Sequence, residues 1–264
     1  MSNTTKQKIY QIDAFANTLF EGNPAMVCPL DEWISDELMQ QIAAENNLSE
    51  TAFFVQKDDT YHLRWFTPKS EVDMCGHATL ASAYVLFEYM NYVGDTIIFE
   101  TKSGALTVHK EGEKFVMDFP MQTIIPSPVE KEIEEAFGIK PTAVFASMDY
   151  IVIFENEHDV LNAQPDLVLL KKLDLRGVCI TAKSTKYDFV TRFFAPKYGI
   201  DEDPVTGSAF TQLVHYWSQA LGKRSFHAKQ LSSRGGEVWC ELAGDRVKLS
   251  GTCVKYLEGE IELS

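Results

Sequence analysis

The 264-residue sequence lacks the short motifs that most directly identify an enzyme class. It contains no HExxH, no CxxC, no Walker A loop, no GxSxG elbow and no GxGxxG fingerprint. Five of its six histidines show no ligand spacing: His62, His109, His158, His215 and His227. We therefore expect neither a bound metal nor an organic cofactor.

Positive charge is also scarce. Asp and Glu outnumber Lys and Arg by 38 to 24, which gives a net charge of −14. Without a run of basic residues, electrostatic binding to nucleic acid or to an anionic membrane is not expected. The acidity is typical of a solvated surface. A small anionic ligand remains compatible with this charge, because backbone amides can bind it locally.

Long apolar runs and paired cysteines are absent as well. No segment is long and apolar enough for a membrane span, and no signal peptide is evident before Ile9. The odd number of cysteines, without paired spacing, fits a reducing compartment, so we expect a cytoplasmic protein. These cysteines are Cys28, Cys75, Cys179, Cys240 and Cys253.

What the sequence does contain is an internal repeat. Residues 64–69 read Arg-Trp-Phe-Thr-Pro-Lys, and residues 192–197 read Arg-Phe-Phe-Ala-Pro-Lys. Each segment resembles a buried strand that ends at a proline. Each is followed by an acidic stretch, a glycine turn and a long helical pattern. The repeat predicts two related halves with a site between them.

The helical segment 78–90 is apolar on almost every side, so it must be enclosed by other structure. Strand-like segments with glycines between them follow it. We expect an α+β fold of two similar domains, each a mixed, mostly antiparallel sheet rolled around a central helix. The proline-containing segment 120–128 is predicted to be a linker. The expected halves are residues 1–124 and 129–252.

The two glycine turns are candidate anion sites. Helices that begin after Gly76 and Gly207 would present unpaired backbone N–H groups and the positive end of the helix dipole. Such a pair would bind a carboxylate or stabilise an enolate-like anion. His77 and Ser208, at the equivalent position of each turn, would add side-chain donors. The structural alternative is a plain helix start at each turn, with Ser208 as its cap.

Three further side chains are candidates for proton transfer. Cys75 lies at a helix start, where a thiol can have a lowered pKa, and His77 is two residues away. Glu50 lies where a polar turn gives way to an apolar strand, a position that suits a general acid/base. Asp203 precedes Pro204. The structural alternatives are a buried filler for Cys75, a solvated acid for Glu50 and a turn residue for Asp203.

These segments together resemble the PhzF-like phenazine-biosynthesis family, whose members are relatives of diaminopimelate epimerase. The resemblance extends over essentially the whole chain. It depends on the order of several motifs, each of which is weak alone: Asp13-Ala14-Phe15, Gly22-Asn23-Pro24-Ala25, Leu48-Ser49-Glu50-Thr51, Arg64-Trp65-Phe66-Thr67-Pro68, Cys75-Gly76-His77-Ala78-Thr79 and Asp203-Pro204-Val205-Thr206-Gly207-Ser208-Ala209.

The resemblance implies a diaminopimelate epimerase-like fold with the active site between the domains. It implies a cofactor-independent isomerase, commonly a homodimer, in which residues 253–264 cross back to the first domain. By motif match, Glu50 resembles the general acid/base of the family. The residues that would orient the substrate, shuttle the proton or bind the anion are His77, Asp203, Ser208, Gly76 and Gly207, with Thr206, Cys75 and Asn23 beside the substrate.

The chain departs from both branches of this group. The epimerases use two opposed cysteines, but the partner position of Cys75 is Thr206, which disfavours a symmetric two-thiol racemase. The phenazine enzyme carries a non-thiol residue at the position of Cys75, so a second acid or base beside Glu50 stays open.

The leading hypothesis is an isomerase that moves a proton between carbons of a small unsaturated or amino-substituted carboxylic acid, with Glu50 as general acid/base. One alternative is a one-carbon epimerase that uses Cys75 and Glu50 on opposite faces. Another is a non-catalytic metabolite-binding protein, and a third is a thiol hydrolase acting through Cys75. Four aromatic residues near these motifs are predicted to be core: Trp65, Phe66, Tyr187 and Phe194.

Overall fold

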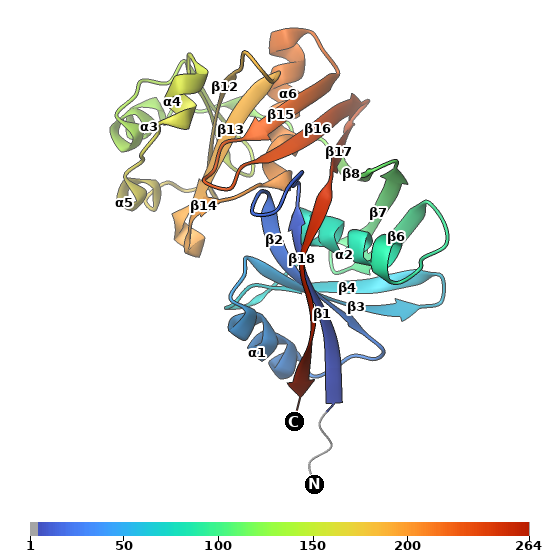
Figure 1. The fold of residues 1–264 in the computed structure, drawn as a ribbon. Helices are drawn as coiled ribbons and strands as arrows, with labels where there is room; N and C mark the ends of the chain where they lie inside the picture. Colours follow the sequence, from blue (N-terminus) through green and yellow to red (C-terminus); the bar gives the residue numbers. More distant parts are fainter. Residues whose placement is uncertain (1–4, 264) are drawn as a thin grey trace. The chain divides into compact units, whose positions relative to one another are not determined.

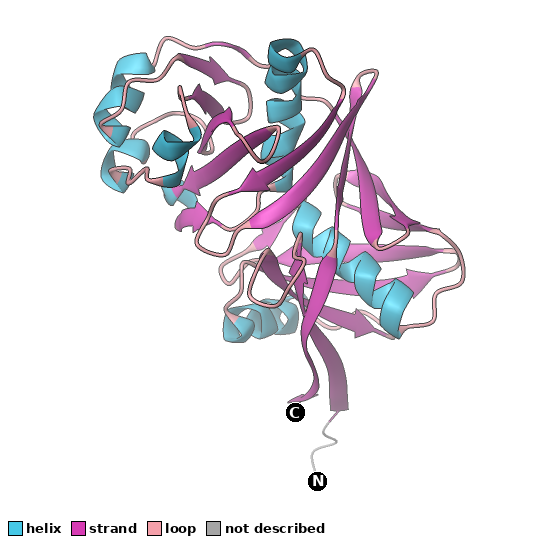
Figure 2. Cartoon of the chain, turned by 45° about the horizontal axis from the view of Figure 1, so that its top comes forward, coloured by secondary structure: helices cyan, strands magenta, loops and turns pink. Residues whose placement is uncertain are grey.

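The chain forms two units that repeat one arrangement of strands. The computed structural model describes residues 5–263. Unit 1 comprises Met1–Asp118 and Ser250–Ser264, and unit 2 comprises Phe119–Leu249. In each unit a mixed sheet surrounds one long helix, which confirms the α+β fold class (Figures 1 and 2).

In unit 1, β1 and β18 pair with each other at one end of the sheet. Its strands pair in the order β18–β1–β2–β3–β4–β6–β7–β8, and β2–β3 and β4–β6 are its parallel pairs. Its helices are α1 (Asp36–Asn46) and α2 (Gly76–Tyr89). Its strands are β1 (Thr5–Ala14), β2 (Asn23–Leu30), β3 (Glu50–Lys57), β4 (Thr60–Phe66), β5 (Glu71–Val72), β6 (Thr96–Thr101), β7 (Gly104–Glu111), β8 (Lys114–Pro120) and β18 (Cys253–Leu263).

Unit 2 repeats this plan. Its strands pair in the order β9–β10–β11–β12–β13–β15–β16, and β11–β12 and β13–β15 are the parallel pairs. The strands are β9 (Ile125–Pro126), β10 (Ala143–Ala146), β11 (Tyr150–Ile153), β12 (Val178–Lys183), β13 (Phe189–Ala195), β14 (Ile200–Asp203), β15 (Ser225–Gln230), β16 (Gly236–Ala243) and β17 (Arg246–Gly251). The helices are α3 (Glu130–Phe137), α4 (Glu157–Leu161), α5 (Leu167–Leu170), the 3₁₀ turn η1 (Pro196–Tyr198) and α6 (Gly207–Leu221).

The helix α2 is enclosed, as its composition predicts. It lies against β1, β2, β3 and β18 (Figure 1). Small residues such as Ala78, Ala81 and Ala83 are buried, and so are the larger Leu80 and Leu86. Buried residues occupy most of the helix surface, and solvent reaches it mainly near its C-terminal end, at Glu88. The sheet therefore has to roll around α2, which fixes where the helix begins.

The equivalent helix α6 packs on aromatic side chains. Phe189 of β13 stacks on Trp217 with ring centroids 5.3 Å apart and an interplanar angle of 4°. Trp217 also donates a hydrogen bond from Nε1 to Thr181 Oγ1 at 3.1 Å. The predicted core aromatics Trp65, Phe66, Tyr187 and Phe194 are all buried.

The segment expected to be a linker, residues 120–128, is partly strand. β9 pairs there with β10, and a proline is tolerated on such a short strand. No helix among residues 5–263 is both long and apolar enough to cross a membrane.

A buried ion pair ties three segments of unit 2 together. The side chain of Asp149, just before β11, is fully buried. It accepts hydrogen bonds from Arg176 Nε at 2.9 Å and Arg176 Nη2 at 2.6 Å. Gln212 of α6 adds a further bond from Nε2 at 2.7 Å, and its Oε1 accepts from the Asp149 N–H at 3.1 Å. This network fixes α6 against the start of β11.

We predict that Arg176→Met destabilises the protein by about 3 kcal/mol, because it leaves the Asp149 carboxylate buried without a counter-charge. Chemical denaturation measures this free energy of unfolding. The double variant Arg176→Met/Asp149→Asn removes the charge but keeps the shape, so it should recover most of the loss. A single variant within about 1 kcal/mol of the wild type would contradict the prediction.

Candidate active site

Glu50 is the first residue of β3, and the strand period decides which way it points. Successive side chains of a strand lie on opposite faces. Phe53 packs beneath α1 with Met39, so the α1 face holds the odd-numbered residues of this strand. Glu50 shares the other face with Ala52 and Phe54. That face is the one covered by α2.

The start of α2 brings a thiol and an imidazole to the same face. Cys75 is the N-cap residue, with an extended backbone at φ −147° and ψ 108°. The backbone N–H and the hydroxyl of Thr79 donate to the Cys75 carbonyl, at 3.1 Å and 2.6 Å. These bonds hold Cys75 and His77 in the first turn, where both side chains are buried.

Cys75, His77 and Glu50 form one cluster. Cys75 Sγ lies 3.5 Å from His77 Nδ1, and His77 Nε2 lies 3.2 Å from Glu50 Oε2. The Glu50 side chain is 14% exposed, and its Oε2, which faces His77, is buried. Within residues 5–263, these three side chains are the one group of His, Cys, Asp or Glu close enough to share a metal ion.

The expected low pKa of Cys75 is wrong. Burial raises the pKa of this thiol, and the nearby Glu50 carboxylate raises it further. His77 and the Ala78 N–H act in the opposite direction but do not offset these effects. The surroundings of Cys75 therefore do not favour a preformed thiolate nucleophile.

His77 carries the positive charge of the cluster. Burial alone would lower the pKa of its imidazole, but Cys75 and Glu50 at its two nitrogens raise that pKa well above the ordinary value. His77 Nε2 faces Glu50 Oε2 at 3.2 Å, and Cys75 Sγ lies on the other side of the ring, next to Nδ1.

Asn23, predicted to bind substrate, is fully buried on β2. Its Oδ1 accepts a hydrogen bond from Ser49 Oγ at 3.2 Å. Ser49 immediately precedes Glu50, so this bond holds the segment that carries the carboxylate. Contact of Asn23 with a substrate stays a prediction.

The second glycine turn has different chemistry. Thr206 is the N-cap residue of α6, and its hydroxyl donates a short hydrogen bond to Asp203 Oδ2. Gln230, fully buried on β15, accepts from the Thr206 N–H at 2.9 Å and donates to the Asp203 carbonyl at 2.6 Å. Asp203, Thr206 and Gly207 are thus fixed as one turn.

Ser208 is not the helix cap, because α6 begins one residue before it. Its Oγ accepts a hydrogen bond from Arg176 Nη2 at 2.8 Å. Sequence reasoning missed Arg176, Asp149 and Gln230. Arg176 is 32 residues from Ser208 and 27 from Asp149, so no local spacing connects them.

The predicted residues therefore fall into two groups. Unit 1 brings together Glu50, Cys75, Gly76 and His77, with Asn23 holding Ser49 beside Glu50. Unit 2 brings together Asp203, Thr206, Gly207 and Ser208. Their joint action on one substrate stays a prediction.

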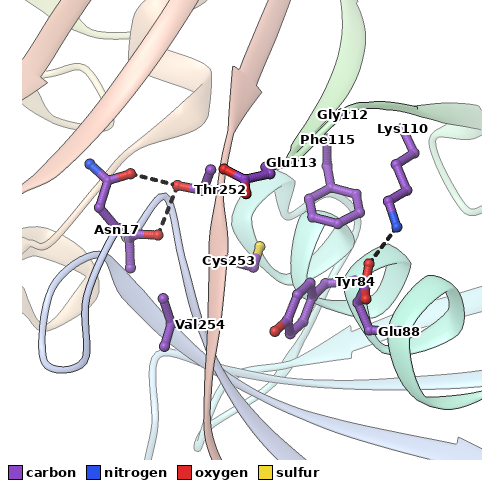
Figure 3. Close-up of a pocket in the computed structure, with 11 residues that line it drawn as sticks. Asn17, Tyr84, Glu88, Lys110, Gly112, Glu113, Phe115, Thr252, Cys253 and Val254 are labelled. Carbon is purple, nitrogen blue, oxygen red and sulfur yellow. Dashed lines mark hydrogen bonds and ion pairs between the residues drawn. The ribbon is translucent and has the colours of Figure 1, made fainter.

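A separate cavity of about 610 Å³ lies in unit 1 (Figure 3). It is lined by Tyr84, Phe115 and Cys253, among others, and by none of the candidate site residues. Its polar walls are largely satisfied internally, since Lys110 pairs with Glu88 and Thr252 donates to Asn17, as the dashed lines in Figure 3 mark. The cavity therefore offers little to direct a reaction.

Comparison with known proteins places this site in a family. A family model described as phenazine biosynthesis-like protein (PhzC-PhzF) matches residues 12–259. The chain is 50% identical over 260 residues to an uncharacterized isomerase of Pseudomonas aeruginosa, covering 97% of this chain and 99% of the relative.

Solved structures of related proteins have the same fold. A PhzF-family phenazine biosynthesis protein of Enterococcus faecalis has a TM-score of 0.97 at 43% identity, covering 98% of this chain and 100% of that one. A predicted epimerase of Pseudomonas aeruginosa has a TM-score of 0.79 at 20% identity over 98% and 100% of the two chains, a likeness that concerns the fold alone. With its repeated halves and its Glu50–His77 pair at a glycine turn, the chain belongs to the phenazine biosynthesis-like (PhzF) family and is an enzyme of the isomerase class.

Proposed function

We propose that this enzyme moves a proton between carbons of a small unsaturated or amino-substituted carboxylic acid, with Glu50 as general acid/base. The observation that carries the proposal is the Glu50–His77 ion pair, which is largely enclosed at the start of a buried helix. An ionised carboxylate in such a place is a base held next to its own counter-charge. The cytoplasmic location and the homodimer expected from the family are proposals for this chain too.

In the proposed reaction, Glu50 takes a proton from one carbon and returns it to another on the same face. When Glu50 is neutralised, negative charge develops on the substrate. The imidazolium of His77 and the N-terminal end of α2 then favour that charge. General acid/base catalysis contributes about 10²–10⁴-fold, and anion-stabilising donors about another 10²–10³-fold.

The second turn is proposed to serve the same reaction. Thr206 and Gln230 fix the backbone of Asp203, and Arg176 holds the hydroxyl of Ser208. We propose that Ser208 and the Gly207 amide bind the substrate carboxylate, and that Asp203 orients the substrate. The repetition of the glycine turn in both halves of the sequence supports this assignment.

The spacing of the cluster argues against a one-carbon epimerase. An acid and a base on opposite faces of one carbon each approach within about 3–3.5 Å, so they lie about 6–7 Å apart. The ligand atoms of Cys75 and Glu50 lie within 4.8 Å of each other. They therefore approach a substrate from the same side.

A non-catalytic metabolite-binding protein is the alternative from another class. It predicts ligand binding without any exchange of carbon-bound hydrogen. Hydrogen exchange in D₂O across a panel of small carboxylic acids, scored for label and for new isomers, separates the two.

We predict that Glu50→Gln lowers kcat by about 10²–10⁴-fold while leaving the fold and ligand binding intact, because the amide cannot accept the proton. Deuterium incorporation and isomer formation measure this loss. The matched control is Glu45→Gln, a substitution at an exposed position of α1. Normal turnover by Glu50→Gln would refute the assignment.

We predict that Cys75→Ala keeps kcat within about tenfold of the wild type, because it loses one weak contact with His77, worth about 1 kcal/mol. Steady-state kinetics with the same substrate check this. A loss as large as that of Glu50→Gln would instead support Cys75 as a second acid or base.

We predict that the His77–Glu50 pair stabilises the fold fully below about pH 6.5 and progressively less as the pH rises above that value. The pKa of His77 is raised above its unfolded value of about 6.5, so its contribution is complete below that pH and is lost as pH rises through the folded pKa. The free energy of unfolding of the wild type exceeds that of His77→Asn by an amount that should therefore shrink as the pH rises above about 6.5, the pKa of histidine in the unfolded chain. His62→Asn is the control, and a difference that grows with pH would count against the ion pair.

A further inference from the structure

The Glu50–Cys75–His77 cluster has the composition of a zinc site. A thiol, an imidazole and a carboxylate are the three side-chain types that bind Zn²⁺. Mg²⁺ and Ca²⁺ prefer oxygen ligands, so the thiol and the imidazole select against them. Three protein ligands leave a fourth position open for water or an anion.

The distances between the ligand atoms are also compatible with a single zinc ion. Zn–ligand bonds of about 2.0–2.3 Å place tetrahedral ligand atoms about 3.3–3.6 Å apart. His77 Nδ1 lies 3.5 Å from Cys75 Sγ, while the other ring nitrogen, Nε2, lies 3.2 Å from Glu50 Oε2. One ligand atom from each residue lies within 4.8 Å of the other two. An ion bonds to only one of the two ring nitrogens, so the side chain that faces the other nitrogen has to shift towards the ion.

Two buried atoms of the cluster lack a hydrogen bond. Among residues 5–263, the few buried side-chain polar atoms without a hydrogen-bond partner include Glu50 Oε2 and His77 Nε2. They form an ion pair at 3.2 Å, but the N–H and the acceptor are not aligned. The His77 side chain is 8% exposed, so solvent contributes little. Buried polar atoms without a hydrogen bond gain more free energy from a new partner than atoms that already have one.

The cluster is also preorganised. Cys75 and His77 are held in the first turn of an enclosed helix, and Glu50 begins a strand beneath it. Ligands on rigid elements lose little conformational entropy when they bind an ion.

We propose that Glu50, Cys75 and His77 form a binding site for a single Zn²⁺ ion, and that the bound ion inhibits the enzyme by occupying Glu50. The binding part depends on the geometry alone. The inhibition part rests on the proposed function, since it requires Glu50 to be the base.

Equilibrium titration of the chelator-treated full-length protein with Co²⁺, followed by displacement with Zn²⁺, tests the binding. Four-coordinate Co²⁺ bound to a thiolate gives a charge-transfer absorption in the near ultraviolet. We expect one equivalent of Co²⁺ per chain with this band, and loss of the band when Zn²⁺ is added. Cys75→Ser, His77→Asn and Glu50→Gln should each weaken binding by about tenfold or more.

Matched controls lie in the same unit. Cys253→Ser removes another thiol and His62→Asn another imidazole, and both should bind Co²⁺ within about twofold of the wild type. Near-ultraviolet circular dichroism of each variant shows that it is folded, and His77→Gln replaces His77→Asn if that variant is not. Co²⁺ uptake without the thiolate band, or unchanged affinity in Cys75→Ser, would overturn the site. So would no uptake by the wild type at millimolar Co²⁺.

Turnover measured with Zn²⁺ and then with excess chelator tests the inhibition, which should be complete and reversible. Failure of the two proposals can be told apart. If Zn²⁺ does not bind but Glu50→Gln abolishes turnover, the zinc site is wrong and the catalytic assignment stands. If Zn²⁺ binds but Glu50→Gln turns over normally, the catalytic assignment is wrong and the zinc site stands.

Discussion

The enclosure of α2 is the constraint on which the site of unit 1 depends. A helix with apolar residues on every side has to be surrounded, and β1, β2, β3 and β18 surround it. Its first turn is therefore buried along with the rest of it. Cys75 and His77 are buried because they precede Leu80 and Leu86, which pack in the interior one or more turns further along the helix. This burial raises the pKa of Cys75, whereas the pKa of His77 is raised by its neighbours Cys75 and Glu50 in spite of burial.

The two glycine turns have the same backbone arrangement but different side chains. In unit 1 the turn has a thiol and an imidazole against a carboxylate, so its charges balance locally. In unit 2 the turn is fixed by hydrogen bonds of Thr206 and Gln230, which include one to the Asp203 carboxylate, and Arg176 binds the Ser208 hydroxyl. Under the proposed function, the first turn moves the proton and the second binds the substrate carboxylate. A duplicated element can diverge in this way because the helix start, not the side chain, is what packing requires.

The sequence predicted best what is repeated or periodic. The apolar pattern of α2, the repeat at β4 and β13 and the order of the motifs were enough for the fold class and the family. The sequence could not predict the pKa values of buried side chains or the contacts between residues that are far apart along the chain. The pKa of Cys75 was misjudged because the sequence shows a helix start but not its burial. Arg176 was missed because its partners Asp149 and Ser208 are far away along the chain, and only the sheet brings them together.

The pairing of β18 with β1 has a consequence for synthesis. Thr5 pairs with Leu263 and Ala14 with Cys253, so unit 1 is completed by the last residues of the chain (Figure 1). Unit 2, by contrast, is one continuous segment, Phe119–Leu249. During translation the second half can therefore fold while the first half still has an open edge at β1. Contacts of such sequence separation form late, so β1 keeps an open edge until residues 253–263 have been synthesised, and loss of that strand would expose the edge to aggregation.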